Sequence, residues 1–111
     1  MKFQQAVATC FGKYVDFSGR ASRSEYWWFV LAYVVLVMLS SFIHEYVYYV
    51  VVLAFLLPLL AAGGRRLHDA GKSAWWLLAS LIPLIGGLVL LFFTVQPSEA
   101  EANEYGLPPA T

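Results

Sequence analysis

The sequence predicts an all-α membrane protein with three transmembrane helices and an N-terminal interfacial amphipathic helix. Of its 111 residues, 60% are hydrophobic and 13% are charged, about half the charged share of an average soluble domain. The mean hydropathy is +0.66. A chain of this length could not bury so much apolar surface in a core of its own. We therefore expect a single membrane domain that covers residues 1–111.

Residues 2–15 are predicted to form the interfacial helix. Their apolar side chains recur at helical spacing, and polar side chains fill much of the opposite face, which is typical of a helix that lies on a membrane surface. The alternative is that this helix packs against the loop of its own protein. Cys10 lies on the apolar side, where a lone cysteine is most simply a small buried hydrophobe.

The first transmembrane helix is expected over residues 23–43. Residues 22–25 read Ser-Arg-Ser-Glu, the pattern of a capping box in which the Ser22 hydroxyl accepts from the Glu25 amide and the Glu25 carboxylate reaches back. Eighteen residues without a formal charge follow, at 26–43. At a rise of ~1.5 Å per residue they nearly cross a hydrocarbon core of ~30 Å.

The second transmembrane helix is expected over residues 46–66 and the third over residues 73–96, with a polar tail at 97–111. These two helices cover the stretches without formal charge at 46–64 and 73–98. Each stretch is long enough to cross a bilayer.

Pro58 and Pro83 lie inside the second and third predicted helices. Each proline removes one hydrogen bond from the helical ladder, so a kink is expected at both positions. An alternative for the third segment is re-entry at residues 83–87, which would return the tail to the side of the membrane that the segment entered from. The tail would then place three acids near the basic residues, namely Glu99, Glu101 and Glu104. Exposed backbone in such a loop must be covered by protein.

All basic residues fall on one side of the membrane if three helices cross. They are Lys2, Lys13, Arg20, Arg23, Arg65, Arg66 and Lys72. The positive-inside rule makes that side cytoplasmic. The N-terminus is therefore predicted inside, and the turn at residues 44–45 and the tail outside.

The candidate site is the charged loop GGRRLHDAGKSAWW at residues 63–76. Together with the arginines before the first span, this loop is predicted to form a cytoplasmic basic collar that binds anionic lipid headgroups or a partner protein. Each cation near an anionic membrane surface contributes ~1 kcal/mol. The residues assigned to the collar are Arg20, Arg23, Arg65, Arg66, His68, Asp69 and Lys72.

Other chemistries have less support in the sequence. The GKS at residues 71–73 lacks the first glycine of a phosphate-binding loop, because Arg66 holds that position. His44 and His68 fall on opposite sides in this topology, so no metal site is predicted. No cofactor and no nucleic-acid partner are expected. The spans carry no ionisable group at depth, whereas transporters and intramembrane enzymes usually keep one.

Three blocks of the chain resemble a known family: FSGRASRSEYWWF at 17–29, RRLHDAGKSAWWLL with IPLIGG at 65–87, and NEYGLPP at 103–109. The chain resembles the small bacterial inner-membrane proteins grouped as domain of unknown function 805. The resemblance covers nearly the whole chain. It implies a multipass protein of the bacterial inner (plasma) membrane and supplies no activity. The matching residues are Gly19, Arg20, Arg23, Glu25, Tyr26, Trp27, Arg65, Arg66, Leu67, His68, Asp69, Ser73, Trp75, Trp76, Asn103, Tyr105 and Gly106.

These observations favour a structural or interaction subunit and not an enzyme. Its expected partners are membrane lipids with anionic headgroups, and either a second copy of the chain or another membrane protein. One alternative is an oligomeric pore or transporter for a neutral or hydrophobic solute. A further alternative is an enzyme that acts on lipid headgroups with His68 and Asp69.

Overall fold

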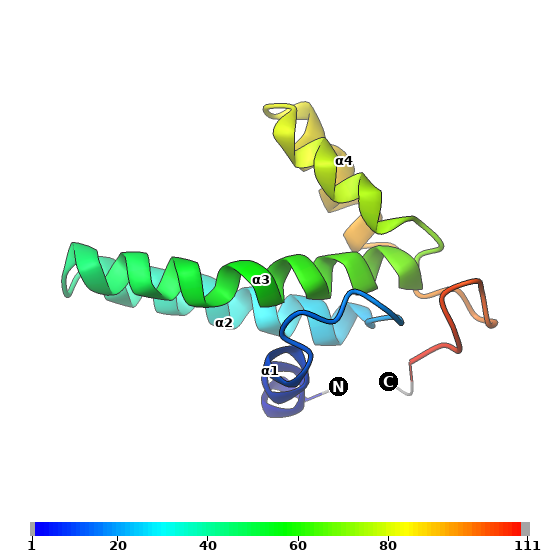
Figure 1. Ribbon diagram of the computed structural model, residues 1–111, viewed down its shortest axis with the longest axis horizontal. Helices are drawn as coiled ribbons and strands as arrows, with labels where there is room; N and C mark the ends of the chain where they lie inside the picture. The colour runs from blue at the N-terminus through cyan, green and yellow to red at the C-terminus, as the bar shows by residue number, and fades with distance from the viewer. Residues whose placement is uncertain (1, 110–111) are drawn as a thin grey trace.

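The computed structural model describes residues 2–109, which form helices and their connections (Figure 1). The elements in chain order are α1 (Phe3–Gly12), α2 (Arg23–Ser41), α3 (Glu45–Asp69), the 3₁₀ helix η1 (Ala74–Leu81) and α4 (Ile85–Thr94). The all-α prediction is confirmed for these residues. Residue 1 of the predicted domain and residues 110–111 of the predicted tail lie outside the described part.

Helices α2 and α3 lie side by side and antiparallel, and we call this pair the α2–α3 arm (Figure 1). Helix α2 begins at Arg23 because the Ser22 hydroxyl accepts a hydrogen bond from the Glu25 amide at 3.2 Å, which confirms the predicted start. The His44 side chain caps α3 by accepting from the Tyr46 amide at 3.1 Å. Both helices are long and apolar enough to cross a membrane.

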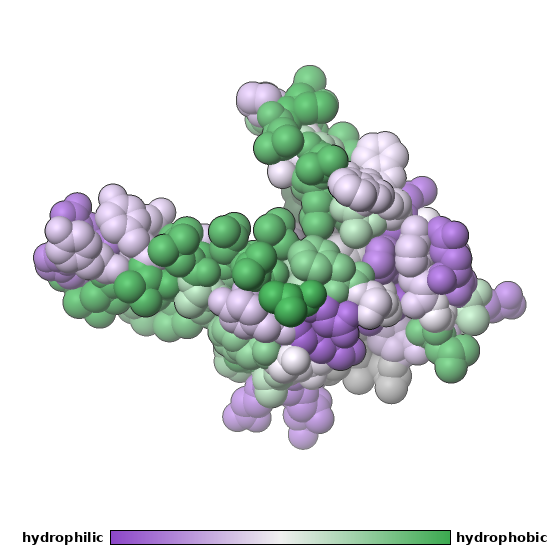
Figure 2. All heavy atoms as spheres, in the orientation of Figure 1, coloured by the Kyte–Doolittle hydropathy of each residue, from purple (hydrophilic) through white to green (hydrophobic). Residues whose placement is uncertain are grey.

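The surface of the α2–α3 arm is apolar, whereas the surface of a soluble protein is mostly covered by polar side chains. Apolar side chains cover the middle of the arm and hydrophilic ones gather at its ends (Figure 2). The exposed apolar side chains include Leu31, Val34, Val35, Leu36, Met38, Leu39 and Leu53. Such a band is expected where hydrocarbon is the solvent, because lipid tails are as apolar as leucine.

The third predicted transmembrane helix, residues 73–96, is not one helix in the structure. It divides into η1 and α4, which fold back on each other as the η1–α4 hairpin (Figure 1). Pro83 disfavours a continuous helix because it has no amide N–H and its ring would clash with the Ala79 carbonyl. Gly86 lets α4 return at close range, since a Cβ there would overlap the Ala79 carbonyl oxygen. The chain thus follows the path of the re-entrant alternative.

Helix η1 packs against the last turns of α3, where the residues are small. A Cβ added at Gly63 would lie 3.3 Å from Leu77 Cδ2, and one at Gly64 would lie 3.3 Å from Ala74 Cβ. The two glycines therefore give η1 the room to approach α3.

Helix α1 packs across the α2–α3 arm and buries Cys10 in a small apolar cluster with Phe29 and Phe55. The Phe11 ring lies 5.2 Å from the Phe29 ring and 5.1 Å from the Phe55 ring. The prediction that Cys10 is buried is confirmed. The helix packs against its own chain, as the alternative expected, but on the helices α2 and α3 instead of on a loop. Its position at a membrane surface stays a prediction.

The tail returns to the end of α3 that carries the charged loop. The Glu99 amide donates to the Asp69 carbonyl at 2.9 Å. The turn between α2 and α3 lies at the far end of the arm (Figure 1). The prediction that the tail lies apart from the charged loop is therefore wrong, because the third apolar segment folds back on itself.

Candidate functional site: a buried charge cluster

Five of the seven residues predicted for the basic collar are buried in the protein. We call them, together with Glu25, the charge cluster: Arg20, Glu25, Arg65, Arg66, His68 and Asp69. Arg65, Arg66 and Asp69 are 0% exposed. Arg23 and Lys72 remain exposed, so the structure does not bring all seven residues onto one surface. Headgroup or partner binding by the collar stays a prediction.

Asp69 lies at the centre of the charge cluster. Its Oδ1 accepts from Arg20 Nε at 2.9 Å, and its Oδ2 accepts from Arg66 Nη1 at 2.7 Å. The Ser98 hydroxyl also donates to Oδ2. One carboxylate thus joins the segment before α2, the end of α3 and the tail. Buried charges are tolerated only when paired and hydrogen-bonded in this way.

The Arg20 side chain binds the tail by hydrogen bonds to backbone carbonyls of the tail. Its Nη1 donates to the carbonyls of Glu101 at 2.9 Å and Gly106 at 3.2 Å. Its Nη2 donates to the carbonyls of Glu99 at 2.7 Å and Asp69 at 3.3 Å. With the bond from Nε, all five N–H donors of this guanidinium are used.

Arg66 holds the end of the η1–α4 hairpin. Its Nε donates to the Thr94 carbonyl at 3.0 Å, its Nη1 to the Ala21 carbonyl at 3.2 Å, and its Nη2 to the Gln96 carbonyl. The last carbonyls of a helix have no partner within the helix and attract cations. Trp27 Nε1 donates to the same Thr94 oxygen at 3.1 Å, which ties α4 to α2 as well.

Arg65 and Glu25 form a second buried ion pair, between α3 and α2. The Glu25 carboxylate therefore bonds across the fold, whereas the capping box predicted that it reaches back to its own helix start. Arg65 Nε also donates to the Asp16 carbonyl at 3.2 Å. Among the described residues, Arg65 Nη2 is a buried side-chain nitrogen without a hydrogen-bond partner.

His68 binds two segments that flank it. Its Nδ1 lies 2.9 Å from the Gly19 carbonyl and acts as the donor, because a carbonyl only accepts. Its ring stacks on Tyr105 at 3.8 Å with an interplanar angle of 1°. Asn103 Nδ2 donates to the His68 carbonyl at 2.9 Å. The tail motif Asn-x-Tyr-Gly is thus a docking segment.

Comparison with known proteins assigns the chain to a family. The family described as "Protein of unknown function (DUF805)" matches residues 14–107. This chain belongs to the DUF805 family. It is 34% identical over 107 residues to "Inner membrane protein YhaH" of Escherichia coli (strain K12), across 86% of this chain and 88% of the relative. It is 40% identical over 103 residues to "Inner membrane protein YhaI" of the same strain, across 86% of this chain and 87% of that relative. No solved structure matches the chain.

The DUF805 match extends over the whole charge cluster and leaves out α1. The relatives are inner membrane proteins, and this chain is likewise a membrane protein of the bacterial inner membrane. The predicted resemblance is thereby confirmed.

Several partners of the charge cluster were missed from the sequence. Ser98 and the carbonyls of residues 94, 96, 99 and 101 lie in segments without a recognisable polar motif. The acids of the tail were the one available signal, since they indicated that the tail complements a basic region. The bonds from Arg20 and Arg66 go to the tail backbone instead of to those acids.

Cys10 lies beside the cluster and is expected to be chemically inert. Its Sγ is 4.0 Å from Glu25 Oε2. Burial raises the pKa of the Cys10 thiol to about 11, and the Glu25 carboxylate adds to the rise. At pH 8 the reactive thiolate is then ~100-fold scarcer than for an unshifted thiol. We expect N-ethylmaleimide to label Cys10 at least ~100-fold more slowly in the folded protein than in the same protein unfolded in SDS. Equal rates would contradict the burial of Cys10.

Proposed function

We propose that this DUF805 protein is a structural or interaction subunit of the inner membrane and not an enzyme. The observation that carries the proposal is that the charged groups of the RRLHD motif bond to each other and to backbone. A catalytic acid or base must come within hydrogen-bond reach of its substrate. Arg66 and Asp69 are 0% exposed and already hydrogen-bonded, so they suit a clasp that fixes the hairpin and the tail.

The proposed topology has two crossings, by α2 and α3, and a hairpin that enters the inner half of the bilayer. Helix η1 has 8 residues and α4 has 10. At rises of ~2.0 Å and ~1.5 Å per residue each is ~15 Å long, about half of a ~30 Å hydrocarbon core. The arginines and Lys72 lie at one end of the arm. Lys2 and Lys13 flank α1, which crosses the arm beside Phe29 and Phe55. The positive-inside rule then places both the N-terminus and the tail in the cytoplasm.

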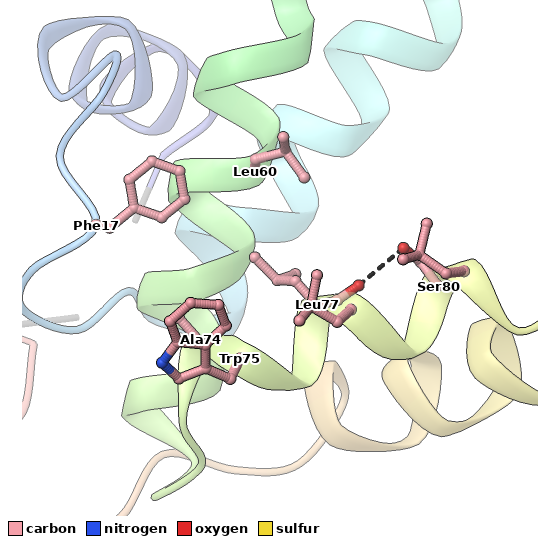
Figure 3. A pocket seen from close by; sticks show the side chains of 8 residues that line it. Phe17, Leu60, Ala74, Trp75, Leu77 and Ser80 are labelled. Atoms are coloured by element: carbon pink, nitrogen blue, oxygen red, sulfur yellow. Dashed lines mark hydrogen bonds between the residues drawn. The ribbon is translucent and has the colours of Figure 1, made fainter.

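The η1–α4 hairpin is the proposed interaction surface. Its base packs against α3 and its tip extends away from the α2–α3 arm (Figure 1). The tip is apolar, with Leu81 76% and Leu84 79% exposed. Between the hairpin and α3 lies an apolar groove of about 420 Å³ (Figure 3). The Ser80 hydroxyl at this groove donates to the Leu77 carbonyl at 2.8 Å. Non-helical backbone at membrane depth must be covered by protein, which supports a membrane protein or a second copy as partner.

Arg23 and Lys72 are the part of the predicted collar that is free to meet anionic headgroups. Both are exposed at the charged end of the arm. In the proposed topology this end lies at the inner surface, where each such cation contributes ~1 kcal/mol.

A cysteine-accessibility map tests the topology. We expect Glu45→Cys, in a Cys10→Ser background, to react with an impermeant maleimide added to intact cells. Ala70→Cys and Ala102→Cys should react only after the membrane is permeabilised, because both lie at the end of the arm opposite residue 45. The Cys10→Ser parent without a reporter is the control. Labelling of Ala102→Cys from outside would restore three crossings and contradict the hairpin.

A further inference from the structure

A second apolar groove lies where α1 crosses the α2–α3 arm. Its volume is about 320 Å³. Phe3, Val7 and Phe11 of α1 form one wall, and Val35, Leu36 and Phe55 of the arm form the others. All its lining residues are apolar. We call it the α1 groove.

The α1 groove opens toward the hydrocarbon side of α1. Helix α1 crosses the first turns of α2, since the Phe3 and Trp28 rings lie 5.7 Å apart and the Phe11 and Phe29 rings 5.2 Å apart. The α2 residues that line the groove, 31–36, come two to seven residues later, which is ~3–10 Å further along the helix axis. Helix α2 begins at the charged end of the arm. The groove therefore runs from the level of α1 into the depth occupied by lipid tails.

The charge of the α1 segment selects for an anionic occupant. Residues 2–15 contain Lys2 and Lys13 and no acid. The two lysines flank α1 and are exposed. The three ion pairs within residues 2–109 involve neither of them. An apolar groove beneath a cationic helix at a membrane surface matches a molecule with an acyl chain and a negative headgroup.

We propose that the α1 groove binds one acyl chain of an anionic phospholipid of the inner leaflet, and that Lys2 and Lys13 attract its headgroup. The leaflet rests on the proposed function, which places α1 at the cytoplasmic face. The lipid would add to the contacts that α1 makes with the arm through Phe3 and Phe11.

The test of the groove compares two adjacent valines of α2. Val35 lines the groove and is 45% exposed, whereas Val34 is 43% exposed and lies outside it. The full chain is purified in detergent, mixed with equal amounts of phosphatidylglycerol and phosphatidylcholine, and examined by native mass spectrometry. We expect the unaltered protein and Val34→Phe to retain one phosphatidylglycerol. Val35→Phe should retain at least ~10-fold less, because the larger side chain adds about four heavy atoms to the groove and displaces the acyl chain. Equal retention by both variants would overturn the proposal.

The test of the headgroup compares two double variants. The double variant Lys2→Gln, Lys13→Gln should lower the preference for phosphatidylglycerol over phosphatidylcholine by ~10- to 30-fold. Each lysine near the headgroup is expected to raise the affinity for the anionic lipid by a factor of about five. Lys2→Arg with Lys13→Arg keeps the charge and should keep the preference. An unchanged preference in the glutamine variant would overturn the role of the lysines.

Two other results would also count against the proposal. Equal retention of both lipids by the unaltered protein would exclude an anionic selection. A dimer that Val35→Phe dissociates would assign the groove to a second copy. The topology is tested separately by the cysteine map, so the lipid site can fail while the proposed function stands.

Discussion

Replacement of Asp69 by asparagine should destabilise the folded protein by about 3–5 kcal/mol, the usual cost of breaking a buried ion pair by removing one partner. The asparagine keeps the shape of the side chain and removes the charge between Arg20 and Arg66, which lie 2.9 and 2.7 Å from its oxygens. Both guanidinium groups would then be buried without a counter-charge. Unfolding in detergent, followed by far-ultraviolet circular dichroism, measures the loss.

Asp16→Asn is the matched control for Asp69→Asn. The Asp16 carboxylate accepts only from the Ser18 amide and hydroxyl, so its loss should cost less than about 1 kcal/mol. These bonds lower the pKa of Asp16. The small contribution of Asp16 to the free energy of unfolding is therefore present at neutral pH, and it is lost as the pH falls through the lowered pKa. If the two variants unfolded alike, the charge cluster would not be the clasp that we describe.

Gly86→Ala and Gly87→Ala should change stability in opposite directions, although the two glycines are neighbours in α4. A Cβ at Gly86 would overlap the Ala79 carbonyl oxygen of η1, whereas a Cβ at Gly87 meets nothing within 4 Å. Forced separation of the hairpin should cost about 3 kcal/mol, the upper end for overpacking. At Gly87 the alanine should instead stabilise the helix by up to ~1 kcal/mol.

The unfolding midpoints of the two alanine variants, measured side by side in one detergent, check this contrast. A Gly86→Ala protein at least as stable as the unaltered chain would show that η1 and α4 are not in backbone contact. It would also remove the physical reason for the hairpin.

The parts of the fold that depend on local sequence were predictable. The apolar runs gave both long helices, and the Ser22 cap gave the start of α2. Helix caps and hydrophobic length act within a few residues, so a single sequence contains all the information that decides them.

The fate of the two prolines was not predictable from the sequence. Pro58 sits within α3, which continues to Asp69, whereas Pro83 sits at the reversal between η1 and α4. Proline weakens a helix at either position. At Pro83 the chain reverses and Gly86 comes close to the Ala79 carbonyl, a reversal that the sequence offered only as an alternative to a kinked helix.

The charge cluster was recognised as a group but not as a buried one. Adjacent arginines at a helix end are typical of a solvated, membrane-facing surface. Here Arg65 pairs with a carboxylate 40 residues earlier, and Arg66 reaches a carbonyl 28 residues later. Burial of such groups depends on which distant segments cover them. The predicted third transmembrane helix placed the tail on the opposite side of the membrane, so the tail was not expected to cover the arginines.

The backbone bonds of Arg20 have a consequence for biogenesis. Arg20 is made early, yet three of its acceptors belong to residues 99, 101 and 106. Until the ribosome has synthesised residues 99–106, the Arg20 guanidinium lacks most of its hydrogen-bond acceptors, and the charge cluster is incomplete. The charge cluster can therefore be completed only after the tail has been made. A chain that stops before position 106 would lack the Gly106 carbonyl that accepts from Arg20.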